Sequence, residues 1–198
     1  MRRVPIYRGV LALPAILLVL GGCIKIQTGP VTPEQATENS NTKAKDYMVN
    51  WHNRLQGASS IEKMTIVTTF IDSVTSNYLR YGAMVAQEWR RGSATRDQAV
   101  ADSEMRTQMD RWNKTQRPVI QAYESMVEYG VEQVTLTNVF DKRTLDLLNQ
   151  ERDFYYKTYS AVFFPVGTAD DYDSRLQDLK GEWRRLSGDM SQAMLRYQ

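Results

Sequence analysis

Cys23 is the only cysteine among 198 residues, and it lies directly behind an apolar stretch near the amino terminus. A thiol can serve as a nucleophile, as a metal ligand or as half of a disulfide. His52 is the only histidine, so the sequence offers no internal disulfide, no multi-histidine metal site and no Cys-x-x-Cys-His haem motif. A catalytic triad would need His52 as its base, but its helical surroundings beside Trp51 favour a surface or groove-lining imidazole.

The first 22 residues have the order of a secretory signal: a basic start, a short apolar run and small residues at the end. The basic residues are Arg2, Arg3 and Arg8, the apolar run spans residues 10–20, and Gly21 and Gly22 follow it. A helix of these 11 residues would be about 16 Å long, roughly half of the hydrocarbon core of a bilayer, and Pro14 interrupts it. We therefore expect a cleaved signal peptide and not a permanent membrane span.

The stretch LGGC, residues 20–23, resembles the lipobox of bacterial lipoproteins. The resemblance implies that the Cys23 sulfur receives diacylglycerol, that the chain is cleaved between Gly22 and Cys23, and that the new amino terminus is acylated, for example with palmitate. In this family Asp after the cysteine implies retention in the inner membrane. Here Ile24 follows, which favours a protein anchored in the outer membrane and facing the periplasm if the host has two membranes. An ordinary signal peptide before a stray thiol is the alternative, but a free thiol is an oxidation liability in an exported protein.

The composition of the chain after the signal limits its partners and its domains. Three of the 25 basic residues lie in the signal, which leaves 22 against 23 acidic residues and a formal charge of −1. No stripe of Lys and Arg indicates nucleic acid. Residues 23–32 include Gly29 and Pro30 and lack periodicity, which predicts a lipidated cysteine with a tether. Residues 33–198 have the length of one domain.

Five segments have the periodicity and the end signals of helices. They begin and end near residues 33–55, 60–92, 96–130, 141–163 and 169 to the carboxyl-terminal region. We expect Gly92 and Gly130 to end helices, Thr95 to cap the third helix, and Pro118 to kink or break it. Residues 131–140 are β-branched and compatible with a connector, a short strand or a helical turn, and we favour a connector.

The apolar spacing of these segments predicts how they pack. Residues 61–85 carry apolar side chains at steps of three and four, and residues 172–190 continue such steps as a heptad seam typical of a coiled coil. Every connection is short, which favours antiparallel neighbours. We therefore predict an all-α fold, an elongated antiparallel bundle of four long helices plus an amino-terminal helix.

Carboxylates are the remaining groups that could do chemistry. Asp170, Asp171 and Asp173 could suggest a Ca²⁺ site, but the spacing lacks the glycine and the closing glutamate of an EF-hand. The first turns of a helix favour negative charge, which explains the three aspartates without a metal. Glu128 and Glu132 lie on either side of Gly130 and fit solvated side chains better than an acid and base pair. The sequence therefore predicts no enzyme and no cofactor.

One aromatic segment exceeds what a single buried stripe needs. The candidate partner or ligand surface consists of Tyr155, Tyr156, Tyr159, Phe163 and Phe164. Tyr155 and Tyr159 fit one inner stripe, whereas the other three lie on neighbouring faces. The excess apolar surface needs a cover, which is either the amino-terminal helix bearing Tyr47 and Trp51 or a partner outside the domain.

These observations favour a lipid-anchored envelope protein whose non-enzymatic body docks another envelope protein as a scaffold, assembly factor or accessory subunit. The alternative is a sensory or ligand-binding bundle that holds an apolar or aromatic molecule between helices near Tyr78, Tyr155, Tyr159 and Trp183. An envelope enzyme acting through carboxylates is a third class, and no residue spacing supports it. Assembly of the body into a homo-oligomer is compatible with each class.

Overall fold

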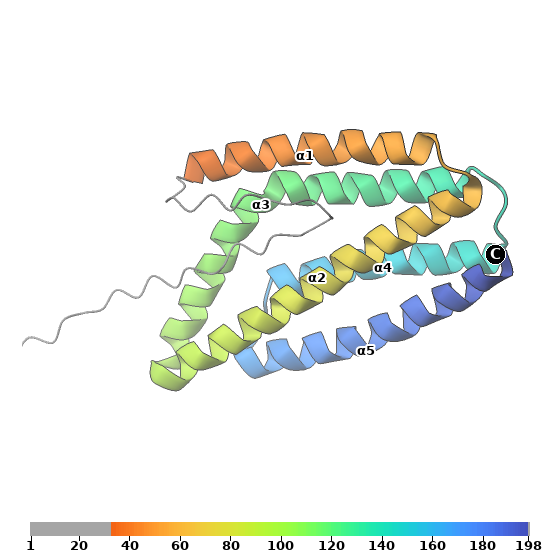
Figure 1. Ribbon diagram of the computed structural model, residues 1–198. Coiled ribbons are helices and arrows are strands. Elements are labelled where there is room, and N and C mark those ends of the chain that lie inside the picture. Colours follow the sequence, from red (N-terminus) through yellow and green to blue (C-terminus); the bar gives the residue numbers. More distant parts are fainter. Residues whose placement is uncertain (1–32, 198) are drawn as a thin grey trace, which may run out of the picture.

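The computed structural model describes residues 33–197, with side chains from residue 38 on. The elements are α1 (Pro33–Gln56), α2 (Ser60–Thr95), α3 (Gln98–Thr135), α4 (Lys142–Phe163), α5 (Ala169–Met194) and a short 3₁₀ turn, η1 (Leu195–Tyr197). No strand occurs between residues 33 and 197, and the five helices pack together, which confirms an all-α bundle (Figure 1). The predicted signal, the lipidation site at Gly22 and Cys23, and the tether lie outside the described residues.

Side-chain caps mark the starts of α2, α4 and α5 close to where the sequence predicts them. Ser59 and Glu62 form a reciprocal capping box at α2, and Thr168 and Asp171 form another at α5. The carboxylate of Asp141 accepts a backbone N–H in the first turn of α4 at 2.7 Å. These groups satisfy amides that have no partner inside the helix, so a local sequence signal is enough to place each start.

The junction between α2 and α3 differs from the prediction. α2 continues through Gly92 to Thr95, so neither the stop at Gly92 nor the cap at Thr95 is correct. Asp97 caps α3, and its carboxylate accepts the backbone N–H of Ala99 at 2.9 Å. A charged carboxylate is favoured at the positive end of the helix dipole. The Thr95 hydroxyl instead donates to a carbonyl in the preceding turn of its own helix.

The path of α3 corrects a second prediction. The helix passes through Gly130 and ends at Thr135, so Gly130 is not a stop and residues 131–135 are helical. A Cβ atom at Gly130 would lie 2.8 Å from Val67 Cγ2 and 3.0 Å from Trp51 Cζ2, which shows that the missing side chain permits a close helix approach. Pro118 lies inside α3, and the helix bends in its middle (Figure 1). Pro118 removes a backbone donor there, which explains the bend.

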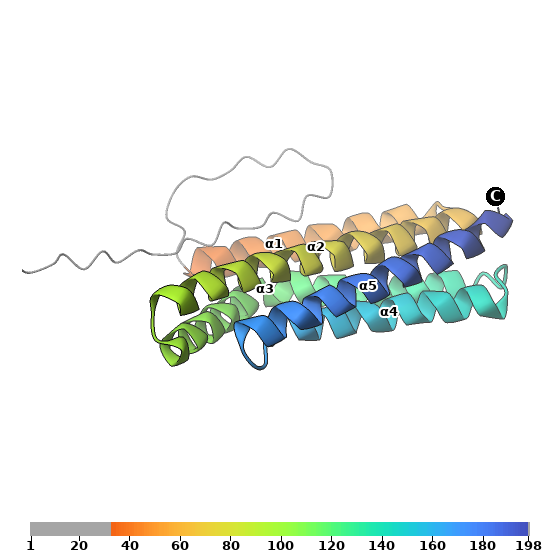
Figure 2. The same ribbon diagram turned by 90° about the horizontal axis from the view of Figure 1, so that it is seen from below.

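The helices run along one long axis, and their connections gather at its two ends (Figure 2). The proximal end, as we name it, holds the start of α1 together with the α2–α3 and α4–α5 connections (Figure 1). The distal end holds the α1–α2 turn, the α3–α4 connector and the carboxyl terminus. α2 is central because it packs on α3, α4 and α5, whereas α1 packs chiefly on α3.

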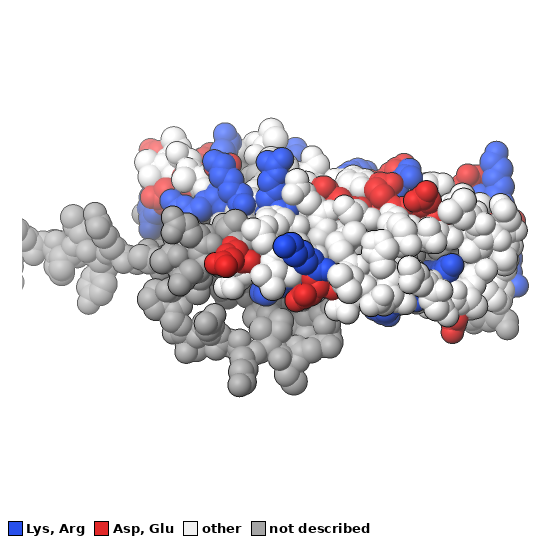
Figure 3. Space-filling model, turned by 90° about the horizontal axis from the view of Figure 1, so that it is seen from above, with Lys and Arg blue, Asp and Glu red and all other residues white. Residues whose placement is uncertain are grey.

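One hydrophobic core extends along the bundle, and charged side chains remain outside it. On the face seen from above, Lys and Arg are interspersed with Asp and Glu among broad uncharged areas (Figure 3). Among the described helices, none has a stretch long and apolar enough to cross a membrane.

Candidate functional site

The predicted partner or ligand surface lies along the second half of α4 and just beyond its end, and the structure divides its five aromatic residues by burial. Tyr155 and Phe163 are buried, Tyr156 and Tyr159 are half-buried, and Phe164 is 55% exposed. Only three of the five rings are therefore accessible to a partner.

Phe163 is covered by α2 and α3. Its ring stacks on Trp112 with a centroid separation of 4.7 Å and an interplanar angle of 4°. The edge of Tyr78 meets the same ring at 5.0 Å. The amino-terminal helix lies elsewhere, since its Tyr47 contacts Tyr123 of α3 at 5.6 Å. Helices α2 and α3, and not α1, therefore cover this aromatic side chain.

Tyr155 and Tyr78 fill the space between α2 and α4, where the sequence allowed a ligand. Their ring centroids are 5.8 Å apart, and burial raises the pKa of both phenols above the ordinary value of 10.0. Both hydroxyl groups are buried, and the interaction between them contributes to the two pKa shifts. Trp183, the fourth member of the predicted pocket, stacks on Phe154 at 5.3 Å. Packing among these rings occupies the interior positions at which the pocket was placed.

The accessible remainder forms the α4 aromatic edge, which we define as Tyr156, Tyr159, Phe164 and Val166. The Tyr156 hydroxyl donates to Glu128 Oε1 at 2.8 Å, and burial raises its pKa. The Tyr159 and Phe164 rings meet edge to face at 5.9 Å. Val166, in the α4–α5 connector, is 62% exposed. This edge combines fixed aromatic side chains with two exposed apolar side chains at the proximal end of the bundle.

A buried carboxyl group in α4 is a feature that the sequence analysis missed. Glu151 is 2% exposed, and its Oε2 atom has no hydrogen-bond partner within the described residues. Loss of hydration, together with the nearby charge of Asp72, raises the pKa of Glu151 from 4.5 to about 8. Asp72 in turn accepts the Trp183 indole N–H at 3.0 Å. The spacing in the sequence could have indicated this burial, because Glu151 lies three residues after Leu148 and four before Tyr155 on the inner face of α4.

The three aspartates at the start of α5 have structural contacts. Asp171 completes the capping box with Thr168. Arg90 of α2 pairs with Asp170 and with Asp173, each at 2.8 Å. No group of three or more His, Cys, Asp or Glu side chains within the described residues is arranged to hold a metal ion. The aspartates therefore join α5 to α2 and begin a helix.

His52 lies half-buried on α1. Its Nδ1 atom is 2.9 Å from the Met48 carbonyl, and its ring lies against Tyr129 with a centroid separation of 4.3 Å. The carbonyl is an acceptor, so the protonated form of Nδ1 donates to it. These contacts make His52 part of the packing between α1 and α3.

Comparison of the chain with protein-family models, with curated proteins and with solved structures finds no match.

Proposed function

We propose that the protein is a lipid-anchored envelope protein whose non-enzymatic body docks another envelope protein through the α4 aromatic edge. The anchor is the diacylglycerol on Cys23 that the lipobox resemblance implies, and the membrane is the outer one in a two-membrane host. The observation that carries the docking proposal is the exposure of Phe164 and Val166, 55% and 62%, beside the half-buried ring of Tyr159. Apolar and aromatic groups gathered in this way are typical of surfaces that become buried on association.

The architecture gives the proposed surface a firm support. We describe the body as an elongated antiparallel bundle of four long helices, with α1 as the added amino-terminal helix because it packs chiefly on α3. The backbone at the end of α4 is held by two side chains: the Tyr172 hydroxyl donates to the Val162 carbonyl at 2.8 Å, and Asn113 donates to the Phe163 carbonyl at 2.9 Å. A surface fixed in this way loses little conformational entropy on binding.

The location of the edge also specifies where a partner must lie. The start of α1, where the tether joins the body, and the α4–α5 connection share the proximal end (Figure 1). A tether of ten residues, 23–32, reaches at most about 35 Å. A partner on the α4 aromatic edge would therefore be held near the bilayer surface, as expected for another membrane-associated protein or for a second copy of this chain.

Paired substitutions at the two ends of the bundle test the proposal. The Phe164→Ser and Val166→Ser double variant removes the exposed apolar groups of the edge. Leu136→Ser with Leu195→Ser is the matched control, because these side chains are 65% and 59% exposed and belong to the α3–α4 connector and to η1 at the distal end. Full-length tagged chains are purified from crosslinked envelopes, and the recovered proteins are identified by mass spectrometry.

We expect the first double variant to lose a specific partner that wild type and control both retain. Recovery of the same partner by all three chains would contradict docking at this edge, and so would an equal loss from both variants. The recovered mass also separates a different envelope protein from a homo-oligomer. Circular dichroism of each variant establishes that the helical content is unchanged.

A further inference from the structure

The side of α1 that faces α2 is poorly filled. α1 packs chiefly on α3, and the backbones of α1 and α2 rarely approach each other, so that long side chains such as Trp51 and Phe70 make the contacts between them. Two hollows lie along this side, with volumes of about 320 and 460 Å³. Both are within the range of small-molecule sites in proteins.

The smaller hollow has an apolar floor. Trp51 of α1, Phe70 of α2 and Met126 of α3 are buried and line it, and Trp51 and Phe70 lie 4.8 Å apart between ring centroids. Half-buried Tyr47 and Ile66 add further apolar surface. The floor combines three helices, so it depends on the tertiary packing and not on one amphipathic face.

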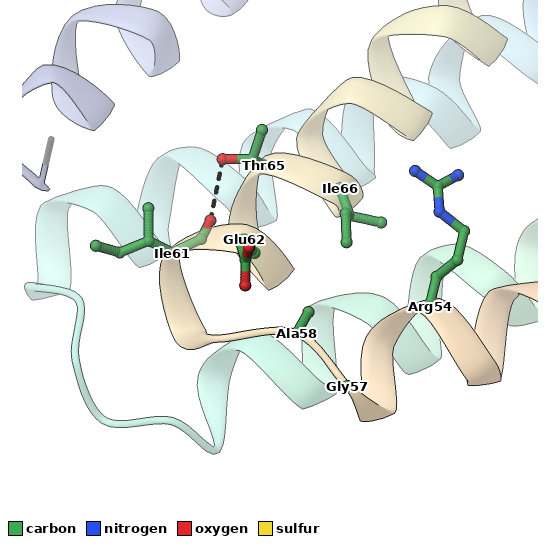
Figure 4. Close-up of a pocket in the computed structure, with 7 residues that line it drawn as sticks. All are labelled: Arg54, Gly57, Ala58, Ile61, Glu62, Thr65 and Ile66. Atoms are coloured by element: carbon green, nitrogen blue, oxygen red, sulfur yellow. Dashed lines mark hydrogen bonds between the residues drawn. The ribbon is translucent and has the colours of Figure 1, made fainter.

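Arg54 stands where the two hollows meet. It lines both of them, together with Thr65 and Ile66, and its side chain extends from α1 toward Ile66 of α2 (Figure 4). Among the described residues Arg54 has no carboxylate partner, and no carboxylate lines the smaller hollow. Glu62 lines the larger one, but its carboxylate accepts the Ser59 backbone N–H at 2.8 Å as part of the capping box. An unpaired cation therefore lies at one end of an apolar floor.

We propose that this α1–α2 groove binds an amphipathic anion, an acyl chain that ends in a negatively charged head. The chain lies on the floor formed by Trp51, Phe70 and Met126, and the head pairs with Arg54. A guanidinium group can hold a carboxylate or a phosphate through two parallel hydrogen bonds. Exposed Thr69, on the α2 side of the groove, adds a hydroxyl at the rim. The site lies on a different pair of helices from the α4 aromatic edge and does not depend on the docking proposal.

Photolabelling of the full chain in isolated membranes tests this site. The probe is a long-chain fatty acid with a diazirine on its chain, and the corresponding alcohol is the comparison because it has the same chain without a negative charge. A diacyl phospholipid with the same diazirine forms a second arm, which distinguishes a free fatty acid from a membrane lipid as the source of the chain. Adducts are mapped by peptide mass spectrometry.

Two variants and two matched controls locate the labelling. Arg54→Gln removes the cation, and Arg111→Gln removes an exposed cation of α3 that also lacks a carboxylate partner among the described residues. Thr69→Trp plugs the groove from an exposed position, and Ser76→Trp adds the same side chain at an exposed position of α2 outside either hollow. All four positions are exposed, so the substitutions leave the core intact.

We expect an anionic probe to form adducts within residues 47–73, at a level at least fivefold above that of the alcohol. Arg54→Gln and Thr69→Trp should each reduce these adducts severalfold, while the two controls match wild type. If the alcohol labelled these residues as strongly as the fatty acid does, the proposal that the groove selects a negatively charged head would be overturned. Labelling that persists in both groove variants, or adducts confined to other segments, would overturn the site itself.

Discussion

Glu151 provides the sharpest test of the packing, because replacing its buried carboxyl group with an amide should change how stability depends on pH. Its pKa is raised from 4.5 to about 8, first by burial and then by the charge of Asp72. The folded state therefore holds a proton more strongly than the unfolded state does. Proton linkage gives the direction of the effect on the free energy of unfolding. The stabilisation that protonated Glu151 provides is complete below pH 4.5 and is lost as the pH rises through about 8.

The magnitude follows from the same shift. Each pKa unit corresponds to about 1.4 kcal/mol, so relative to low pH the folded state loses about 3 kcal/mol at pH 7, where Glu151 still keeps its proton, and about 5 kcal/mol above pH 8, where it ionises. Glu151→Gln keeps the size of the side chain and cannot ionise. We expect the variant to match wild type near pH 5 and to be more stable by about 3 to 5 kcal/mol at pH 9.

Urea unfolding followed by circular dichroism at pH 5, 7 and 9 measures this difference. Glu132→Gln is the matched control, because it makes the same chemical change at an exposed position on α3. The control should follow the wild-type pH profile. Parallel profiles for wild type and Glu151→Gln would refute the inference that this carboxyl group is buried without a partner.

Three further predictions concern the anchor and two glycines. Cys23→Ser should leave the precursor uncleaved or release the body from the membrane, as fractionation and mass spectrometry would reveal; unchanged attachment of a cleaved chain would contradict the lipid anchor. Gly130→Ala should destabilise the protein by about 1 to 3 kcal/mol, because the new Cβ meets Val67 at 2.8 Å and Trp51 at 3.0 Å. Gly181→Ala should instead stabilise it by about 0.5 to 1 kcal/mol, since nothing lies within 4 Å and alanine is the better helix former. A Gly130→Ala melting temperature equal to or above that of wild type would contradict the close approach of Trp51 and Val67, and a lower one for Gly181→Ala would contradict the open surroundings of that glycine.

Local signals predicted most of the helix boundaries and failed where two of them competed. The capping box of Ser59 and Glu62 was recognisable because its two partners are three residues apart. At the next junction a threonine and an aspartate could both act as caps, and Asp97 is the one that does. Gly130 has the residue type of a helix stop, but the close approach of Trp51 and Val67 shows a packing role that spacing along one segment does not reveal.

The aromatic segment of α4 also combines features that periodicity predicts with features that only packing between helices decides. Periodicity indicated that Tyr155 would be buried and that Phe164 would lie outside the main stripe, as the structure shows. It did not indicate that Phe163 stacks on Trp112, because the two residues are far apart in the sequence and meet only where α3 crosses α4. The cover of an apolar face depends on which helix arrives there, so the accessible surface was smaller than the predicted one.

The sequence by itself determined the all-helical character of residues 33–197, most helix starts and the apolar stripes, because caps and periodicity act within one or two turns of a chain. Tertiary structure alone decided that α1 packs on α3. Among residues 33–197 it also decided that the Glu151 Oε2 atom is enclosed without a hydrogen-bond partner, and that Arg54 lies without a carboxylate partner where two hollows meet. These features arise from contacts between separate helices, and the free energy of such contacts depends on the bend of α3 and on side-chain shape, which no single segment encodes.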